Sequence, residues 1–519
     1  MIFNKLTMKN NILKYLFSLS ILLFVGCTND LDTEPKVELS LEDLLEQDPN
    51  AVEGILSRLY ASFALSGADG PGSSDISDDP GESPFLRGIV NLQDFTADGM
   101  KNRWGDNGLD QLTTTSDWNS ENKFFRYMYN RIFFTIPQCN NLLSILENVE
   151  VENKEQILAE VRFIRSLAYY YLIDVFGKGV LATQENFGET NPLPEASRQE
   201  LFDFTEAELL AIQSSLPPTN TYGRATESAA AMLLSKLYLN AEVYTGTARY
   251  NDAATYLNVV IASSHTLADD FVSLFSADNN TSNEIIFPLI ADAVVSQSFG
   301  NTTYIVNGSL NSETTPLNQF GATEGWGGHR ASKGWYGLFG DLSTSNDVRA
   351  SLFWTEGHEY EMTDYTTWTD GYPSIKFRNT NFNGTSLASS FSSTDFPLFR
   401  LADAYLMYAE CAVRGASNAS MTDALTYVNL VRARSNADAI GMGDLTLNFL
   451  IDERGRELNL EGHRRSDLIR FGMFTGGSYL WPWKGNTLNG TSIPSTYNVF
   501  PIPSTALQAN PNLTQNLGY

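Results

Sequence analysis

Cysteine is scarce in this chain, with three residues among 519. Cys139 and Cys411 each lie beside apolar residues in segments of helical character. We therefore expect two buried free thiols, with a disulfide as the alternative. The third cysteine, Cys27, belongs to the N-terminal segment considered below. The length exceeds what one hydrophobic core usually serves, so several subdomains or a repeat array are expected.

Histidine is also scarce, and the short catalytic motifs are missing. None of the four histidines has the paired spacing of a catalytic zinc site. Neither a Gly-x-Ser-x-Gly elbow nor a phosphate-binding Gly-x-x-x-x-Gly-Lys loop occurs. With 61 acidic residues, neighbouring carboxylates are unavoidable, and no local pattern marks the acid pair of a glycosidase. We expect no catalytic residues.

Two acidic loops lack the calcium-binding pattern. Residues 75–79 contain three aspartates, and Asp269, Asp270 and Asp278 form a second group. Neither group has the Asp-x-Asp-x-Asp-Gly loop with its distal glutamate. We expect solvated loops and no cofactor, with a structural Ca²⁺ as the alternative.

Basic residues are few, with 34 Lys and Arg against 61 Asp and Glu, which gives a net charge of −27. Nucleic acids and anionic membrane surfaces are bound through basic patches. The charge therefore argues against either as a partner.

Long hydrophobic runs are missing apart from one near the N-terminus. It covers about a dozen residues around Tyr15–Phe24, fewer than the ~20 of a spanning helix. Lys5, Lys9 and Lys14 lie in and before this run. A basic region followed by a short apolar region predicts a secretory signal over residues 1–26.

The end of this signal resembles that of a bacterial lipoprotein, because Cys27 would be the first mature residue. The resemblance implies that Cys27 is acylated, with an ordinary signal peptide as the alternative. Residues 27–40 are polar and acidic and lack periodicity, so we expect an extended tether.

Most of the remaining chain alternates helical segments with long irregular ones. The helical segments pair in the small-and-aromatic pattern of tetratricopeptide units. Such pairs must stack to bury their apolar faces, so we expect a mostly α, tetratricopeptide-like helical-repeat scaffold, mainly over 121–263 and 397–470. The predicted helices are Asn122–Leu146, Lys154–Phe176, Leu201–Leu216, Thr226–Tyr244, Asn251–Ser263, Leu401–Gly415 and Met421–Ser435.

Two irregular insertions interrupt the scaffold, over residues 64–120 and 265–396. Both exceed ordinary loop lengths. Their Trp, Phe and Tyr content argues for order, because disordered segments are poor in aromatics. We expect a loop-rich half with short strands, for example at Ile285–Leu289, within one domain over 41–519.

Each insertion contains a tryptophan between glycines. Trp104 lies in Asp98–Gly108, and Trp326 lies in Gly321–Arg330. Glycine permits tight turns and does not shield an indole. An open indole can lie against the C–H face of a sugar ring while polar groups bond its hydroxyls. The neighbouring polar groups are those of Asn102, Asp106, Asn107, His329 and Arg330. The alternative is that each indole fixes its loop to the scaffold.

The densest charge pattern lies in Glu453–Arg470. Like-charged glutamates recur at i,i+4 and are offset by arginines. We expect a buried arginine–carboxylate network at a helix corner rather than a catalytic site.

Four segments carry motifs of one known family, namely Glu160–Gly177, Phe399–Glu410, Glu453–Arg470 and Phe500–Asn516. Together they resemble the SusD/RagB family of glycan-binding outer-membrane lipoproteins, across essentially the whole mature chain. The sequence departs from the family's pattern at Lys178-Gly179-Val180 and at Gly455, both in the scaffold.

The resemblance is strongest to the starch-binding branch, through the two Trp loops and Gly67–Pro71. It implies that an aromatic arc holds a curved α-glucan. It also implies a TonB-dependent SusC-like transporter as the partner. The arc would comprise Trp104, Trp326 and Tyr304, with Arg87, Asp106 and Asn107 as hydroxyl partners.

We therefore expect a surface-exposed outer-membrane lipoprotein that binds starch or malto-oligosaccharides and delivers them to the transporter. The alternatives are a different glycan, a surface glycoside hydrolase, and a scaffold that binds another protein.

Overall fold

The computed structural model describes residues 40–519. The predicted signal, Cys27 and nearly all of the tether lie outside the described residues. The chain divides after Ala51 into two units. In the first, helix α2 (Leu41–Gln47) begins with a capping box. There the hydroxyl of Ser40 accepts the backbone N–H of Asp43, and the Asp43 carboxylate accepts the N–H of Ser40.

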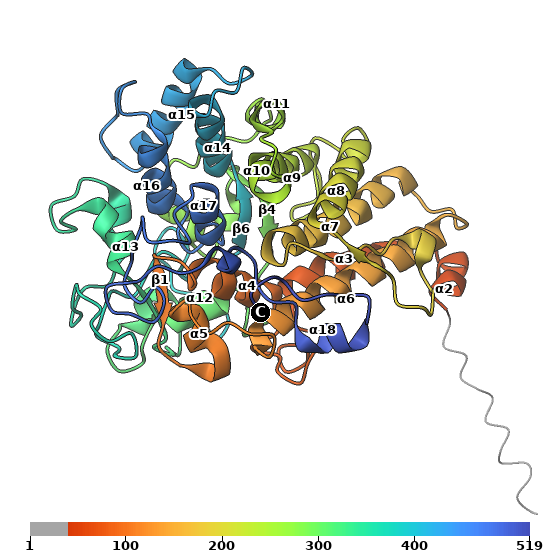
Figure 1. Ribbon diagram of the computed structural model, residues 1–519, viewed down its shortest axis with the longest axis horizontal. Coiled ribbons are helices and arrows are strands. Elements are labelled where there is room, and N and C mark those ends of the chain that lie inside the picture. Colours follow the sequence, from red (N-terminus) through yellow and green to blue (C-terminus); the bar gives the residue numbers. More distant parts are fainter. Residues whose placement is uncertain (1–39) are drawn as a thin grey trace, which may run out of the picture. The chain divides into compact units, whose positions relative to one another are not determined.

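The second unit, Val52–Tyr519, is mostly helical, and its longer helices follow one another in a band (Figure 1). Within the band α6 packs on α7, α7 on α8, α9 on α11, α11 on α14, and α14 on α15. This confirms the expected class, a helical scaffold with loop-rich insertions. The helices are α3 (Ala51–Ala64), α6 (Lys123–Leu146), α7 (Lys154–Val175), α8 (Arg198–Ile212), α9 (Glu227–Leu239), α10 (Ala241–Thr245), α11 (Tyr250–Ile261), α14 (Leu401–Val413), α15 (Met421–Arg434), α16 (Leu447–Leu458), α17 (Arg464–Arg470) and α18 (Ser504–Ala509).

Side-chain caps and small residues explain where these helices begin and how closely they pack. Asn122 accepts the N–H of Phe124 at the start of α6, and Thr226 accepts the N–H of Ala229 at the start of α9. The alanines at 229–231 on α9, and two more on α11, are fully buried. Such small side chains allow neighbouring helices to approach closely. Cys139 and Cys411 are buried and free, as expected.

The helix predicted over Thr226–Tyr244 is instead broken in two at Asn240. The backbone there leaves the helical region, with φ −92° and ψ 3°. The amide of Asn240 donates to the carbonyl of Lys236 at 2.9 Å and accepts from Arg470 at 3.0 Å. The break therefore lets one side chain join α9 to α17.

The loop-rich half contains short helices as well as the expected strands. Its helices were not predicted, because each is short and contains Gly, Asn or Thr. They are α4 (Phe85–Ile89), α5 (Leu109–Thr113), α12 (Thr302–Ser309) and α13 (Lys333–Tyr336).

Three two-stranded antiparallel sheets occur in the second unit. The strand expected at Ile285–Leu289 is present as β4. The pairs are β1 (Met100–Asn102) with β5 (His329–Ala331), β2 (Gly179–Val180) with β3 (Glu195–Ala196), and β4 with β6 (Phe396–Arg400).

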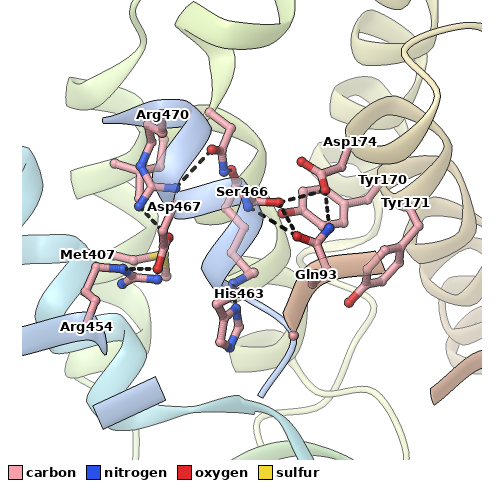
Figure 2. A pocket seen from close by; sticks show the side chains of 14 residues that line it. Gln93, Tyr170, Tyr171, Asp174, Met407, Arg454, His463, Ser466, Asp467 and Arg470 are labelled. Carbon is pink, nitrogen blue, oxygen red and sulfur yellow. Dashed lines mark hydrogen bonds and ion pairs between the residues drawn. The ribbon is translucent and has the colours of Figure 1, made fainter. Parts of the chain in front are cut away.

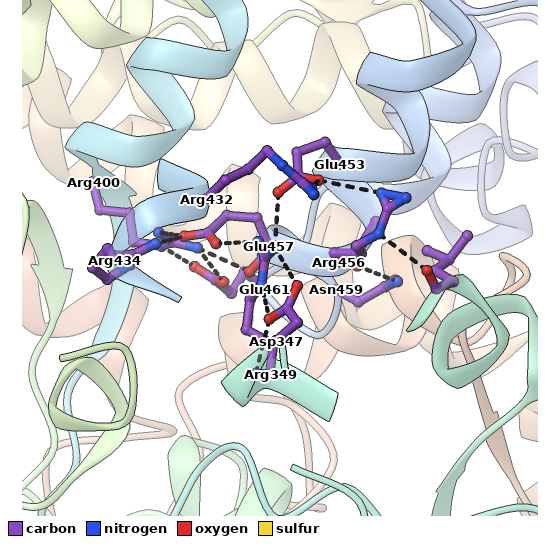
Figure 3. A network of polar contacts seen from close by, with 12 residues as sticks. Asp347, Arg349, Arg400, Arg432, Arg434, Glu453, Arg456, Glu457, Asn459 and Glu461 are labelled. Atoms are coloured by element: carbon purple, nitrogen blue, oxygen red, sulfur yellow. Dashed lines mark hydrogen bonds and ion pairs between the residues drawn. The ribbon is translucent and has the colours of Figure 1, made fainter. Parts of the chain in front are cut away.

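An arginine–glutamate network joins α16 to both halves (Figure 3). Glu457 of α16 accepts Nη1 of Arg400 at 2.7 Å, from the end of β6, and Nη1 of Arg349 at 2.8 Å, from the loop-rich half. Glu453 accepts Nη2 of Arg349, and Glu461 accepts Nε of Arg400 at 2.6 Å. All five side chains are at most 1% exposed. The structural interpretation of this charge pattern is therefore supported.

The glutamates of this network stay ionised despite their burial. Burial raises the pKa of Glu457, but Arg434, Arg400 and Arg349 outweigh it and hold that pKa well below its ordinary value of 4.5. The pKa values of Glu453 and Glu461 are lowered by the same balance of burial and neighbouring cations. Each carboxylate is therefore ionised in the folded protein at neutral pH and holds its arginines in place.

A small polar cavity beside α17 is also held by internal bonds (Figure 2). The carboxylate of Asp174 accepts hydrogen bonds from Gln93 at 2.7 Å and Ser466 at 2.8 Å. Asp467 accepts from Arg454 and Arg470, each at 2.8 Å. The carboxylates at this cavity thus have partners within the chain and brace the packing of α7 and α17.

Replacing Glu457 with Gln should destabilise the protein by about 3–5 kcal/mol, because it leaves buried arginines beside a neutral amide. Urea unfolding measures the change. Glu150→Gln is the matched control, since the Glu150 side chain is 87% exposed, and it should change the free energy of unfolding by under about 0.5 kcal/mol. Equal effects of the two substitutions would contradict the proposed importance of the network.

The same network gives a pH dependence. In the unfolded chain these glutamates take up protons near pH 4.5, whereas in the folded state they remain ionised to lower pH. Their stabilisation is therefore complete above about pH 5 and is lost as the pH falls below it. Urea unfolding between about pH 5 and pH 3 should show a shallower loss of stability for Glu457→Gln than for the wild type. If stability fell equally with pH in the wild type and in Glu457→Gln, the pH dependence would not come from Glu457.

Candidate functional site

The β1–β5 pairing brings the two Trp loops together. Its register places Met100 opposite Ala331 and Asn102 opposite His329. Because the strands are antiparallel, the residues that follow β1 meet those that precede β5. Trp104 and Trp326 therefore become neighbours although 222 positions separate them in the sequence.

The two indoles lie side by side and are tilted. Their ring centroids are 6.4 Å apart, with an angle of 52° between the planes. Nε1 of Trp104 donates to the carbonyl of Trp326 at 3.3 Å, and the backbone N–H of Trp104 donates to Oδ1 of Asn102 at 2.7 Å. Both residues are partly exposed. The expectation of two accessible tryptophans is thus compatible with the structure.

Two glycines leave room for the aromatic rings. A Cβ at Gly328 would lie 2.3 Å from the indole of Trp104, and a Cβ at Gly308 would lie 2.1 Å from the imidazole of His329. The glycines beside Trp104 and Trp326 therefore do more than permit turns. Because Gly328 has no side chain, the indole of Trp104 can occupy the space beside it.

Tyr304 lies beneath the indoles instead of forming an open third arm. Its side chain is 0% exposed, and its hydroxyl donates to Oδ1 of Asn91 at 2.8 Å. The guanidinium of Arg87 lies 4.4 Å from its ring centroid, and the Trp104 ring is 6.0 Å away. The expectation of an exposed ring at Tyr304 is corrected, because these neighbours cover the ring. Tyr304 supports Trp104 from below.

The polar residues around Trp104 are exposed to different degrees. Arg87 is 7% exposed and lies 3.5 Å from a carboxylate oxygen of Glu82 and 3.9 Å from one of Asp106. The Asp106 side chain is 39% exposed, and Asn107 is exposed. Asp106 and Asn107 can therefore meet a ligand directly, whereas Arg87 presents only an edge.

Asn102 and His329 are not available to a ligand, contrary to expectation. Both are at most 1% exposed, and Nδ2 of Asn102 lies 2.8 Å from Nδ1 of His329. Burial, with the charge of Arg87, lowers the pKa of His329 to about 3, so its ring is neutral. A neutral ring that accepts at Nδ1 must donate at Nε2, which lies 3.0 Å from the carbonyl of Tyr304. These residues hold β1, β5 and α12 together.

Arg330 is likewise a structural residue rather than a hydroxyl partner. It is 0% exposed and donates to several carbonyls, including those of Gly328 at 3.0 Å and Asp370 at 3.1 Å. Burial, with the charge of Arg103, lowers its pKa to about 9.

Arg103 and Trp368 were not singled out in the sequence. The backbone N–H of Arg103 donates to the carbonyl of Gly328 at 3.1 Å, and its guanidinium lies 5.8 Å from the ring centroid of Trp368. Trp368 is 9% exposed. The motif that contains Trp104 could have drawn attention to Arg103, but no local signal links Trp368 to it.

Two aspartates of the acidic loops have partners within the protein. Asp75 pairs with Arg58 at 3.3 Å and with Arg131 at 3.6 Å. Asp278 accepts the N–H of Phe382 at 2.8 Å. Among residues 40–519 there is no group of three or more His, Cys, Asp or Glu placed to hold a metal ion. Over the same residues, no helix has both the length and the apolar character to cross a bilayer.

Known proteins resemble this chain over its whole length. The model of the SusD family matches residues 351–519, and a model described as "Starch-binding associating with outer membrane" matches residues 90–239. Starch-binding protein SusD of Bacteroides thetaiotaomicron is 32% identical across 99% of this chain and 100% of its own length. A SusD-like protein of Formosa agariphila is 24% identical across 98% of each chain.

Solved structures share the fold. Surface glycan-binding protein A of Bacteroides thetaiotaomicron, in complex with laminarihexaose, superposes with a TM-score of 0.70 at 20% identity, over 90% of this chain and 99% of the other. A SusD superfamily protein of Parabacteroides distasonis gives 0.71 at 21%, over 91% and 99%.

The fold and the matches define a carbohydrate-binding protein of a class associated with the outer membrane. The chain belongs to the SusD family. It is a surface glycan-binding protein and not an enzyme.

Gly328→Ala should displace the indole of Trp104, because the added Cβ would lie 2.3 Å from it. We expect a changed near-UV circular dichroism spectrum and a loss of about 1–3 kcal/mol of stability. Gly72→Ala is the control, since a Cβ there meets no atom within 4 Å. An unchanged indole signal in Gly328→Ala would mean that the loop yields without moving Trp104.

Proposed function

We propose that the protein captures starch and malto-oligosaccharides at the cell surface through Trp104 and Trp326. The observation that carries the proposal is the pair of tilted, partly exposed indoles at the end of the β1–β5 sheet. The 32% identity to a starch-binding protein across the whole chain supports the choice of glycan.

The geometry of the indoles favours a curved glycan. Each indole can stack on the C–H face of one sugar ring. Two planes at 52° cannot both lie flat against a straight ribbon of sugars, but they can follow a chain whose successive rings turn. Selectivity for α-glucan would then come from shape, through poor contact with straight chains.

The polar rim would bond the hydroxyls of the bound sugars. Asp106 accepts hydrogen bonds, and Asn107 both donates and accepts. Arg87 lies 3.9 Å from Asp106 and would donate from its exposed edge. Tyr304 would act indirectly, by supporting Trp104 and Arg87.

The family and the N-terminal sequence support the proposed location and partner. Acylation at Cys27 would tether the protein to the outer membrane. A TonB-dependent SusC-like transporter would receive the glycan. Weak binding at one site would suffice, because a polysaccharide presents many copies of the same epitope.

A β-glucan is the second candidate ligand, because a structure with the same fold contains laminarihexaose. Affinity gels with amylopectin, pullulan, dextran, levan and laminarin distinguish the candidates. Retardation by amylopectin and pullulan supports an α-glucan receptor, and retardation by laminarin alone would overturn it.

Trp326→Ala should abolish the heat of malto-oligosaccharide binding in calorimetry, a loss of at least about tenfold in affinity. Its stability should remain within about 1 kcal/mol of the wild type, because the indole is partly exposed. Phe382→Ala is the control, since it removes a 54%-exposed ring from another loop. A large loss of stability with binding retained would favour a protein-binding scaffold with structural tryptophans.

Tyr304→Phe should leave affinity within about twofold of the wild type, because the hydroxyl already bonds Asn91 inside the protein. It should lower stability by about 1 kcal/mol, since Oδ1 of Asn91 loses its donor. Calorimetry and urea unfolding measure the two effects. A strong loss of affinity at unchanged stability would instead indicate direct contact between Tyr304 and the sugar.

A further inference from the structure

A second pocket, distinct from the Trp pair, has the chemistry of a sugar site. We propose that the Tyr pocket, lined by Tyr360, Tyr372, Phe353, Asp341 and Thr355, binds pyranose rings of the same glycan chain. The class of ligand rests on the proposed function, whereas the existence of the pocket is inferred from the residues that line it.

Two tyrosines form the aromatic wall of the Tyr pocket. Tyr360 is 42% exposed and Tyr372 is partly exposed, with ring centroids 6.3 Å apart and planes at 72°. Both rings pack on the buried Tyr336, at 4.9 and 4.6 Å. The hydroxyl of Tyr336 also donates to the carbonyl of Tyr360. The wall is therefore held in place by a buried ring, which preorganises it for stacking.

The rest of the pocket supplies an apolar floor and a polar rim. Phe353 is 6% exposed and packs edge-on against Tyr336. The rim comprises a carboxylate and three hydroxyls, from Asp341, Ser343, Ser351 and Thr355, and the open pocket has a volume of about 620 Å³. Pockets that hold small ligands measure ~300–1000 Å³. Aromatic faces beside short hydroxyl and carboxylate groups suit a polyhydroxylated ring.

The charges around the Tyr pocket favour a neutral sugar. Asp341 and Glu359 are exposed acidic residues, and the net charge of the chain is −27. The nearby cation Lys333 already pairs with Glu361 at 2.7 Å. A carboxylated or sulfated glycan would be repelled, whereas a neutral glucan would not.

The Tyr pocket is attached to the same sheet as the Trp pair. Ala331, the last residue of β5, donates to the carbonyl of Tyr372 at 2.7 Å, and the N–H of Tyr372 donates back at 3.2 Å. Trp326 lies five positions before Ala331, a span of at most ~18 Å. The two aromatic sites are thus linked through one short stretch of backbone.

This arrangement predicts a dependence on chain length. A short oligosaccharide occupies only the Trp pair, whereas a polysaccharide engages the Trp pair and the Tyr pocket together. The second contact is then intramolecular and raises the affinity for long chains alone.

Tyr360→Ala removes the more exposed ring, and Thr355→Arg fills the pocket from its rim without altering the tyrosines. Each variant is titrated with maltotriose by calorimetry and with amylopectin by affinity gel, beside the wild type and Trp326→Ala. We expect both variants to bind maltotriose as the wild type does. Both should bind amylopectin at least about fivefold more weakly.

The outcomes separate this proposal from the proposed function. Wild-type affinity for amylopectin in both variants would overturn the proposal that the Tyr pocket binds sugar. It would leave the proposed role of the Trp pair unaffected. Equal losses of affinity for maltotriose and for amylopectin would also overturn the proposal. The substitutions would then have weakened binding at the Trp pair rather than removed a second sugar site. Absence of maltotriose and amylopectin binding by the wild type would instead refute the proposed function, and with it the ligand assigned to this pocket.

Discussion

The site depends on one short pairing of β1 with β5. Three residues on each strand bring together loops more than 220 positions apart. Because successive side chains on a strand point to opposite faces, a slip of one residue would exchange the buried His329 with Arg330. The observed register prevents that exchange through specific bonds. His329 meets Asn102 and Tyr304, whereas Arg330 reaches the carbonyls of Gly328 and Asp370.

A binding surface made of loops needs a stiff support, and buried charge provides it here. Arg349 comes from the loop-rich half and Arg400 from the junction with α14, and both bind Glu457 of α16. Removing one partner would leave the others charged and buried, so the network resists partial opening. Rigid loops lose little conformational entropy on binding, which suits a receptor that relies on stacking and a few hydrogen bonds.

The sequence predicted the scaffold better than the site. The helical spacing of apolar and small residues located α6, α7, α11, α14 and α15 to within a few residues, and the charge pattern indicated the buried network. Proximity along the chain, however, does not show which side a residue faces. His329 and Arg330 follow the Trp326 loop directly, yet β5 buries both. The resemblance named Tyr304 but did not show that its ring is buried. Tyr360 and Tyr372 both pack on the buried Tyr336, and no local sequence pattern indicated that contact.

The electrostatics of the site are consistent with a neutral ligand. His329, whose ring centroid lies 5.1 Å from that of Trp104, has its pKa lowered to about 3 by burial and the charge of Arg87, so it is uncharged at any ordinary pH. Arg87, whose guanidinium lies 6.0 Å from the Trp104 ring centroid, is balanced by Glu82 and Asp106. Glu82 in turn lies 2.5 Å from Lys123. With the charge of Arg87 offset within the protein, binding would depend on ring faces and hydrogen bonds, which uncharged sugars can satisfy.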